Sequence, residues 1–389
     1  MFNLDKLVSM GFTINQATVL TKLFKRIGYA GKFTAEDLVA DVENRSIFEI
    51  NSIEGLKAVF KSDSQFYKDI ETIFTQKANN NPWQSKVETV VVYQIPSEVD
   101  YGQAIDDFIS TNANYGQILI DSRNAEDIQL ASVKANANGR LFIGQTYDEN
   151  IKINAEGNIA EALKGLNIEK CILVYHPDNE YLAGGLAGVL AQNQLGLTGP
   201  LFATVTNCTP QNYDETTTNN LEALNVASYQ YVNPVNGGGV EEYATPIVAP
   251  GKSINGQDAK RTYIKFSIDL LLKAKAIDFL KRGLTYEDIS AKILDGMLSS
   301  VLVECQKGDG AFKRLVKLDT SKSDGTIVKG FELKVGRPSD LQDEQPSVYA
   351  SETYPVTGYY RDALTGKKVE INLVVDPSTL ELSALGFGE

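Results

Sequence analysis

Strand-like and helix-like segments alternate from residue 86 to about residue 227, and this alternation constrains the fold more than any other feature. The strand-like runs VETVVVYQI, YGQILID, RLFIGQT and KCILVYHP are each followed by a run with helical spacing of its apolar residues. Nearly continuous apolar strands are typical of parallel sheets covered by helices on both faces. The pattern therefore predicts a layered α/β domain with a mostly parallel sheet, in which LFATVT, residues 201–206, is a further strand.

The segments before residue 86 predict a strand followed by helices. Residues 11–19, GFTINQATV, alternate apolar and polar residues as a half-buried strand does. Thr34 stands before Glu36 and Asp37, which is typical of a helix start. Further helices are expected over SIEGLKAVF and SQFYKDIETIFTQ, and the apolar residues that share one face of the second are Phe66, Ile70, Ile73 and Phe74. The run KANNNPWQ then breaks the pattern and predicts a domain boundary.

After residue 227 the pattern changes again. We expect a hairpin and loop around the glycines at 237–239, and two long amphipathic helices over residues 259–283 and 285–308. Thr285 and Asp288 have the spacing of a capping box at the start of the second helix. Residues 326–336 and 367–376 alternate as strands do, and the polar, acidic residues 337–358 between them predict a linker.

These boundaries divide the chain into four segments and make its class α/β, or α+β over the whole length. The segments are an N-terminal arm (1–20), a helical and strand segment (21–86), an α/β domain (87–255) and a C-terminal domain that ends in an arm strand (256–389).

Charge and cysteine usage exclude several classes of function. The net charge of −13 would repel nucleic-acid backbones, so we expect no nucleic-acid partner. Cys171, Cys208 and Cys305 form no CxxC pair, which predicts buried small hydrophobes rather than a zinc site or a disulfide framework. The N-terminus lacks the pattern of a signal peptide, and no apolar run approaches the roughly 20 residues that span a bilayer. We therefore expect folding in a reducing cytoplasm.

Three glycines in EYLAGGLAGVLAQN admit two interpretations, a loop that cradles a phosphate or a helix that packs closely. A dinucleotide fingerprint places its glycines in the turn between strand and helix. The turn here, HPDNEY, contains none, and Gly184, Gly185 and Gly188 follow later among alanines. This arrangement favours close packing of a helix.

Polar residues at two strand ends are the other candidates for chemistry. His176, the only histidine, precedes Asp178 at a strand's carboxyl end, where such a pair can perform acid–base catalysis. No G-x-S-x-G motif accompanies it, and one histidine does not complete a typical metal cluster, so a turn histidine without a catalytic role is favoured. For Asp121 and the following residues Arg123, Glu126 and Asp127, a helix cap is favoured over a metal site. We predict no catalytic, cofactor-binding or metal-binding residue, and no enzyme.

Alternating strands near both ends of the chain suggest assembly. A strand carried on an arm can add to the edge of a neighbouring subunit's sheet. Head-to-tail contacts of this kind build rings or helical filaments.

The order of the segments resembles that of tail sheath proteins of contractile-tailed bacteriophages, in the compact group once catalogued as a domain of unknown function. The likeness runs through ENRSIFEINSIEGLKAVFKSDSQFYKDIETIFTQ, the following strand–helix–strand stretch, the Ala/Gly-rich run EYLAGGLAGVLAQNQLGLTGPLFATVTNCTP and SIDLLLKAKAIDFL. It covers roughly residues 12–375, and the order of segments carries it rather than any single motif.

The resemblance implies a structural protein of a virion, assembled in the host cytoplasm. Such subunits stack as hexameric rings around a tail tube and contract to drive the tube through the host envelope. The implied partners are further copies of the chain, the tail tube protein, and the baseplate and tail terminator proteins, with no cofactor and no membrane insertion.

The resemblance also implies roles for the two arm strands and one helix, on a layered α/β core. The residues expected to join subunits by strand addition are Phe12, Ile14, Val19, Val369, Ile371, Leu373 and Val375. The helix over residues 260–282 is expected to face the tube through Lys265, Lys273 and Lys275, on a largely solvated cationic face. The N-terminal piece before the first strand is short, which puts its reach to a neighbour in question.

Two other classes remain as alternatives. KCILVYHPDNEYLAGGLAGVLAQN also looks like part of a soluble α/β protein that binds small solutes, but such a protein needs a second similar lobe, which the last 130 residues do not predict. A dehydrogenase-like enzyme is disfavoured by the missing glycine turn.

Overall fold

The computed structural model describes residues 25–43, 45–76, 87–111, 115–192, 201, 203–232, 245–307 and 316–361. Both predicted arm strands, residues 11–19 and 367–376, lie outside the described residues, as does the glycine turn at 237–239. The seven residues predicted to join subunits therefore lie outside them as well: Phe12, Ile14, Val19, Val369, Ile371, Leu373 and Val375. No helix in the described part of the chain is long and apolar enough to cross a membrane.

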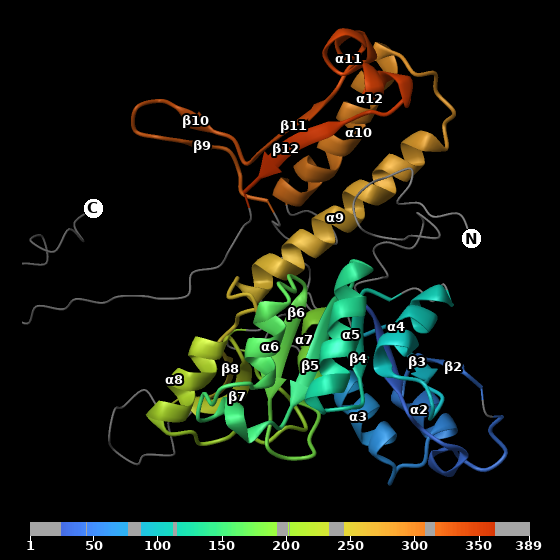
Figure 1. Cartoon of the computed structure of the whole chain (residues 1–389), viewed down its shortest axis with the longest axis vertical. Coiled ribbons are helices and arrows are strands. Elements are labelled where there is room, and N and C mark those ends of the chain that lie inside the picture. The colour runs from blue at the N-terminus through green and yellow to red at the C-terminus, as the bar shows by residue number, and fades with distance from the viewer. Residues whose placement is uncertain are drawn as a thin grey trace, which may run out of the picture.

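An eight-stranded sheet forms the centre of the larger part of the molecule, shown in the lower half of Figure 1. Its order is β2-β3-β1-β4-β5-β6-β7-β8, and the six inner strands run parallel while the two edge strands are antiparallel. The predicted layered α/β fold is confirmed. The strands are β1 (Arg26–Gly31), β2 (Ile47–Ile50), β3 (Thr89–Gln94), β4 (Gln117–Ile120), β5 (Leu141–Thr146), β6 (Cys171–Tyr175), β7 (Ala227–Val232) and β8 (Thr245–Ala249).

Helices cover both faces of this sheet (Figure 1). Each face buries large apolar side chains, each of which contributes roughly 1.5–3 kcal/mol to stability. One face packs against α2 (Ile53–Val59), α3 (Gln65–Phe74), α7 (Leu182–Gln192) and the first half of α9. The other packs against α4 (Tyr101–Ser110), α5 (Ala125–Ala137), α6 (Ile159–Gly165) and α8 (Glu215–Leu224).

A smaller part of the molecule lies beyond the sheet and is reached through α9 (Ala259–Leu280), as Figure 1 shows. Helix α9 packs against α10 (Asp288–Lys307), which in turn supports a two-stranded antiparallel sheet of β11 and β12. Phe279, Leu294, Leu298 and Val335 are buried in a second core here. The remaining elements are β9 (Thr320–Ser321), β10 (Ile327–Val328), β11 (Phe331–Val335), α11 (Pro338–Glu344), α12 (Pro346–Ala350) and β12 (Val356–Tyr360).

The predicted linker over residues 337–358 is wrong, because this segment is folded. Pro338 and Pro346 each stand at the start of a short helix, where the missing N–H of proline costs no hydrogen bond. Leu341 of α11 is buried, and Val356 begins strand β12.

Other local predictions also need correction. Thr34 does form a capping box with Asp37, but the helix it starts is a single 3-10 turn, η3 (Ala35–Asp37). The described part of residues 201–206 forms no strand, while α8, which follows it, was not predicted. Helix α10 begins at Asp288, whose carboxylate accepts hydrogen bonds from the N–H and hydroxyl of Ser339.

Candidate functional site

The turn between β6 and α7 lies at the carboxyl edge of the parallel sheet, where α/β proteins place their sites. His176 is buried at the start of this turn, and its Nε2 lies 3.1 Å from the Thr209 carbonyl oxygen. Its Nδ1 accepts the N–H of Asp178 at 3.3 Å, so the proton sits on Nε2 and is donated to Thr209. The carboxylate of Glu180 accepts both the N–H and the hydroxyl of Thr209.

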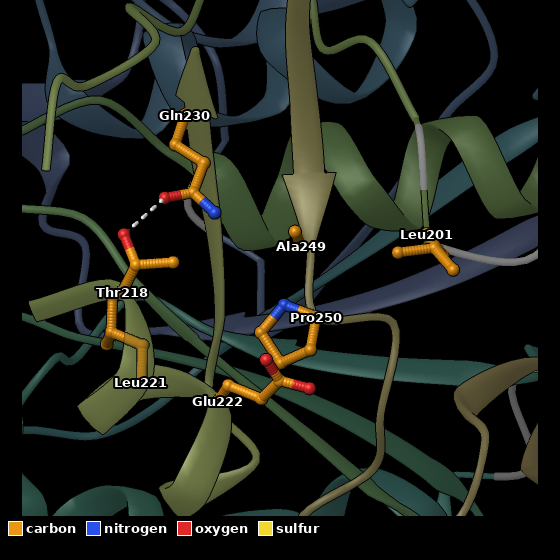
Figure 2. Close-up of a pocket in the computed structure, with 7 residues that line it drawn as sticks. All are labelled: Leu201, Thr218, Leu221, Glu222, Gln230, Ala249 and Pro250. Carbon is orange, nitrogen blue, oxygen red and sulfur yellow. Dashed lines mark hydrogen bonds between the residues drawn. The ribbon is translucent and has the colours of Figure 1, made fainter. Parts of the chain in front are cut away.

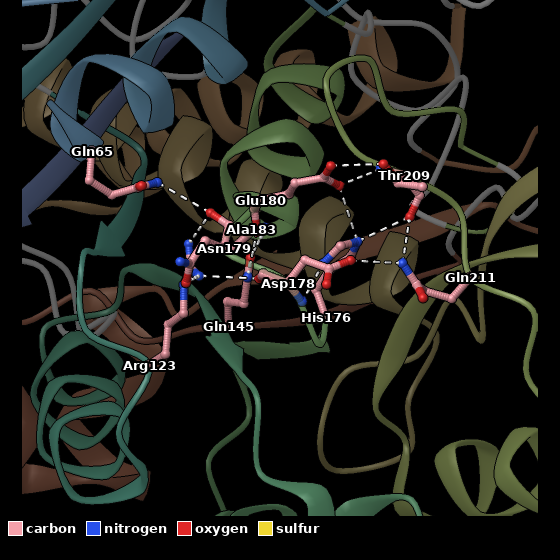
Figure 3. A network of polar contacts seen from close by, with 10 residues as sticks. All are labelled: Gln65, Arg123, Gln145, His176, Asp178, Asn179, Glu180, Ala183, Thr209 and Gln211. Atoms are coloured by element: carbon pink, nitrogen blue, oxygen red, sulfur yellow. Dashed lines mark hydrogen bonds and ion pairs between the residues drawn. The ribbon is translucent and has the colours of Figure 1, made fainter. Parts of the chain in front are cut away.

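Side chains from three other elements hold the same turn, as Figure 3 shows. Arg123, which follows β4, donates to the carbonyl oxygens of Asp178 at 3.3 Å and Asn179 at 3.0 Å. Gln145 of β5 donates to the Glu180 carbonyl and accepts the N–H of Ala183, which satisfies a free donor in the first turn of α7. Gln65 of α3 donates to the Asn179 carbonyl at 3.2 Å.

A metal ion does not fit this arrangement. Ligand atoms of His176, Asp178 and Glu180 lie within 4.8 Å of one another, which makes them the candidate cluster. A histidine ligand needs a free ring-nitrogen lone pair, yet one nitrogen donates to Thr209 and the other accepts from Asp178. Both Glu180 oxygens are also engaged. The network therefore supports a turn histidine that fastens loops together.

A buried carboxylate, Asp69, and a half-buried one, Asp121, lie near this edge. Asp69 of α3 accepts hydrogen bonds from the Tyr29 hydroxyl at 2.9 Å and from Gln65 at 2.6 Å, and burial raises its pKa to about 6. Asp121 accepts hydrogen bonds from the Tyr101 hydroxyl at 2.8 Å and the Lys32 N–H at 3.0 Å, and burial raises its pKa as well. Both carboxylates use their oxygens to join strands and helices.

Asp121 is therefore not the helix cap that its position predicts. The first turn of α5 does contain Glu126 and Asp127, as expected for acidic residues that complement the helix dipole. Asp127 accepts the Ser122 hydroxyl at 2.5 Å, and Ser122 accepts the N–H of Asn124. The N-cap of α5 is Asn124, whose side chain accepts no hydrogen bond from the first turn of the helix.

The glycines of α7 are confirmed as packing residues. A Cβ atom at Gly185 would lie 2.2 Å from Val205 Cγ1, and one at Gly188 would lie 2.4 Å from the Ile73 carbonyl oxygen. Helix α7 thus approaches α3 more closely than any side chain at Gly188 would allow. The structure gives these glycines no role in a phosphate-binding turn.

The cysteines behave largely as predicted. Cys171 and Cys305 are buried free thiols, and burial raises the pKa of each to about 12. Cys208 is half-buried, and burial also raises its pKa. These thiols stay protonated at neutral pH and offer no reactive thiolate.

A shallow pocket of about 170 Å³ lies between α8 and the outer strands β7 and β8 (Figure 2). Its only hydrogen bond between lining side chains joins Thr218 to Gln230 at 3.4 Å. Glu222 at the rim also pairs with Lys252 at 3.4 Å. The residues that line the pocket are Leu201, Thr218, Leu221, Glu222, Gln230, Ala249 and Pro250. Such a lining offers an apolar surface without converging catalytic groups.

The lysines of α9 differ from one another in exposure. Lys265 is exposed and pairs with Glu169 at 2.8 Å, and Lys275 is half-buried. Lys260 and Lys273 are buried, so the expectation of a largely solvated cationic face is wrong for these two residues. Of the three lysines predicted to face a tube, Lys265 and Lys275 remain accessible and Lys273 does not.

The fold built from these parts is similar to that of the helical sheath of the anti-feeding prophage, which confirms the predicted resemblance to sheath proteins at the level of fold. The helical sheath of the anti-feeding prophage in its contracted state matches with a TM-score of 0.62 over 95% of this chain and 97% of that chain, at 9% identity. The baseplate of the same particle, 6-fold symmetrised, also contains a matching chain, with a TM-score of 0.62, 9% identity and coverage of 94% and 95%. The sequence matches no family model and no curated protein.

The two alternative classes find no support in these results. The described residues after 258 form helices and small antiparallel sheets, not the second α/β lobe that a two-lobed solute-binding protein needs. The strand-to-helix turn before α7 is closed by side-chain hydrogen bonds, whereas a dehydrogenase holds a dinucleotide in the corresponding glycine turn.

Proposed function

We propose that this chain is a structural subunit of a contractile tail sheath. Its copies stack as hexameric rings around a tail tube, and the stack shortens to drive the tube through a host envelope. The observation that carries this proposal is the likeness of fold over almost the full length of a helical sheath protein, including the small part beyond α9. In this role the chain is not an enzyme, and its activity is assembly and rearrangement.

The sheet of β11 and β12 supports a role in strand exchange. Among the described residues no third strand pairs with either of its two strands. Four of the five β12 residues are exposed. Successive side chains of a strand point to opposite faces, so β12 is exposed on both of its faces. An open edge of this kind is a template for an added strand. We propose that the segments 11–19 and 367–376 of neighbouring copies add there.

The partners follow from this arrangement. Further copies of the chain are the main partner, and the tail tube, baseplate and tail terminator proteins contact the stack at its inner surface and its ends. The likeness to a chain of the anti-feeding prophage baseplate supports contact with a baseplate. The place of action is a tail or tail-like particle assembled in the host cytoplasm.

The test is assembly of two truncated chains, compared by negative-stain electron microscopy at matched concentration. We expect the full chain to form tubes or stacked rings with six-fold end views. Removal of residues 366–389 deletes the strand segment and should leave a folded protein that does not polymerise. Removal of residues 377–389 alone keeps the segment and should leave polymerisation intact.

Two results would contradict the proposal in different ways. A full chain that stays monomeric at every concentration tested would refute the sheath role. Long tubes from the chain without residues 366–389 would refute strand donation by the C-terminal segment and leave the sheath role standing.

A further inference from the structure

A short hairpin, β9–β10, projects from the small part of the molecule away from α10 and from the sheet of β11 and β12, as Figure 1 shows. Its paired residues are Ser321 with Ile327 and Thr320 with Val328. The Lys322 N–H donates to the Thr326 carbonyl at 2.8 Å and closes the turn. Gly325 adopts φ +78°, a left-handed conformation that glycine takes without strain. The hairpin therefore has a defined turn and register.

The base of the hairpin is firmly attached to the rest of the protein. Asp319 Oδ1 accepts the Gly330 N–H at 2.7 Å and the Gln306 amide at 3.1 Å. The same Gln306 amide, from α10, donates to the Lys317 carbonyl at 2.8 Å. Arg361 exchanges backbone bonds with both sides of the base, accepting from Lys317 and donating to Gly330, each at 2.7 Å. These bonds fix the direction in which the hairpin projects.

No element in the described part of the chain covers the projecting part of the hairpin. Every residue from 317 to 327 is exposed, and Leu318 and Ile327 retain 45% and 65% of their accessible surface. A two-stranded hairpin without a covering element is at best marginally stable in water. An anchored base with an uncovered aliphatic side chain is the arrangement expected of a contact element, because burial of Ile327 against a partner would complete the hairpin's packing.

The charges of the hairpin indicate the chemistry of that partner. Asp319 accepts the Gly330 N–H and Asp324 accepts the Thr326 N–H. These hydrogen bonds lower the pKa of both carboxyl groups, so both aspartates keep their negative charge. Residues 317–329 contain three lysines, at 317, 322 and 329, against these two aspartates, which gives the hairpin a net charge of +1. The chain as a whole has a net charge of −13. A second copy of this chain therefore offers an acidic surface that complements the hairpin.

We propose that the β9–β10 hairpin is a contact element between copies of this chain, in which Ile327 and the adjacent lysines dock on the acidic surface of a second copy. The proposal rests on the proposed function, since it assumes that copies assemble. It adds a contact that is distinct from strand addition at β11 and β12, because the hairpin is folded within its own protomer and offers a side-chain surface.

The test compares Ile327→Thr with Ile153→Thr in the full chain. Threonine keeps the β-branched shape, so the hairpin retains its strand preference. Ile153 is 71% exposed in the loop before α6 and provides a matched loss of one exposed isoleucine elsewhere. The measured quantity is the protein concentration at which assembly begins, detected by light scattering and sedimentation. Ile327→Thr should raise this concentration roughly tenfold, as loss of one buried aliphatic contact does, while Ile153→Thr should match the wild type.

A second variant and a second measurement distinguish loss of the contact from local unfolding of the hairpin. Lys322→Glu leaves Ile327 in place and should also raise the concentration, with the effect reduced at high salt. Amide hydrogen exchange over residues 317–329 should slow when the wild type assembles. If Ile327→Thr and Lys322→Glu both assemble like the wild type, the hairpin contact is refuted and the sheath role is untouched. If the wild type itself does not assemble, the sheath role fails first and the hairpin contact fails with it.

Discussion

Replacement of Gly188 by alanine tests the close approach of α7 to α3, which is central to the larger core. The added Cβ would lie 2.4 Å from the Ile73 carbonyl oxygen and 2.8 Å from Gln76 Cγ. The first contact is with backbone near the C-terminal end of α3, which a rotamer change does not relieve. The second is with a side chain whose amide is held by the carbonyls of Thr72 and Thr206.

The magnitude follows from two opposing effects. Overpacking of a dense core costs roughly 1–3 kcal/mol, and the backbone contact places Gly188→Ala at the upper end of that range. Alanine in place of a helical glycine stabilises the helix by about 1 kcal/mol. We therefore expect Gly188→Ala to lower the free energy of unfolding by about 2 kcal/mol. The Cβ contact at Gly185 is with Val205, a side chain in a loop, so Gly185→Ala should cost less.

Gly296 provides the matched control. It lies within α10, is exposed, and has no atom within 4 Å of its added Cβ. Gly296→Ala should therefore stabilise the protein by about 0.5–1 kcal/mol through helix propensity alone. Urea unfolding followed by far-UV circular dichroism would measure all three midpoints. If Gly188→Ala is as stable as Gly296→Ala, the helices separate freely and the packing argument is wrong.

Three further predictions concern stability. Asp69→Asn should flatten the pH dependence of the free energy of unfolding between pH 4 and 7. The pKa of Asp69 in the folded protein is about 6, above its ordinary 3.8, so the protonated carboxyl stabilises the fold by about 3 kcal/mol at low pH. This stabilisation is lost as the pH rises through 6. A urea midpoint that changes with pH in the variant as it does in the wild type would contradict this. Equimolar Zn²⁺ should leave the melting temperature unchanged, since both ring nitrogens of His176 are engaged; an upward shift would restore the metal site. Leu341→Ala should cost roughly 2–4 kcal/mol in urea unfolding, whereas a residue in a linker would cost nothing.

The central strands were predictable from their sequence because burial on both faces leaves a continuous apolar run. β1 was not, since RIGYAG contains a charge and two glycines. At Gly28 a Cβ would lie 2.8 Å from the Tyr115 ring and 2.9 Å from the Phe108 ring. The aromatic side chains that fill this part of the core are remote in sequence from β1. The sequence of β1 therefore lacks the apolar run that identifies the other strands.

The candidate site was predictable only in part for a related reason. His176 and Arg123 each stand out in the sequence at the end of a strand. Thr209 and Gln145, which also hold the turn after β6, come from separate elements and carry no local pattern. Short helices raise the same difficulty. Residues 337–358 bury few apolar side chains, among them Leu341, so their polar composition resembles that of a linker.

Helix α9 is shared by the two cores, and this has a mechanical consequence. Ile264 and Ile268 are buried in the larger core, Phe279 in the smaller one, and Leu272 and Ala276 contact both. With 22 residues, the helix is about 33 Å long. A continuous rod of this length, embedded at both ends, resists bending, so a force applied to the tip of the molecule reaches the sheet with little loss. In the proposed assembly, a protomer should therefore move as one stiff lever when copies slide or turn against one another, and the strain should fall on the contacts between copies.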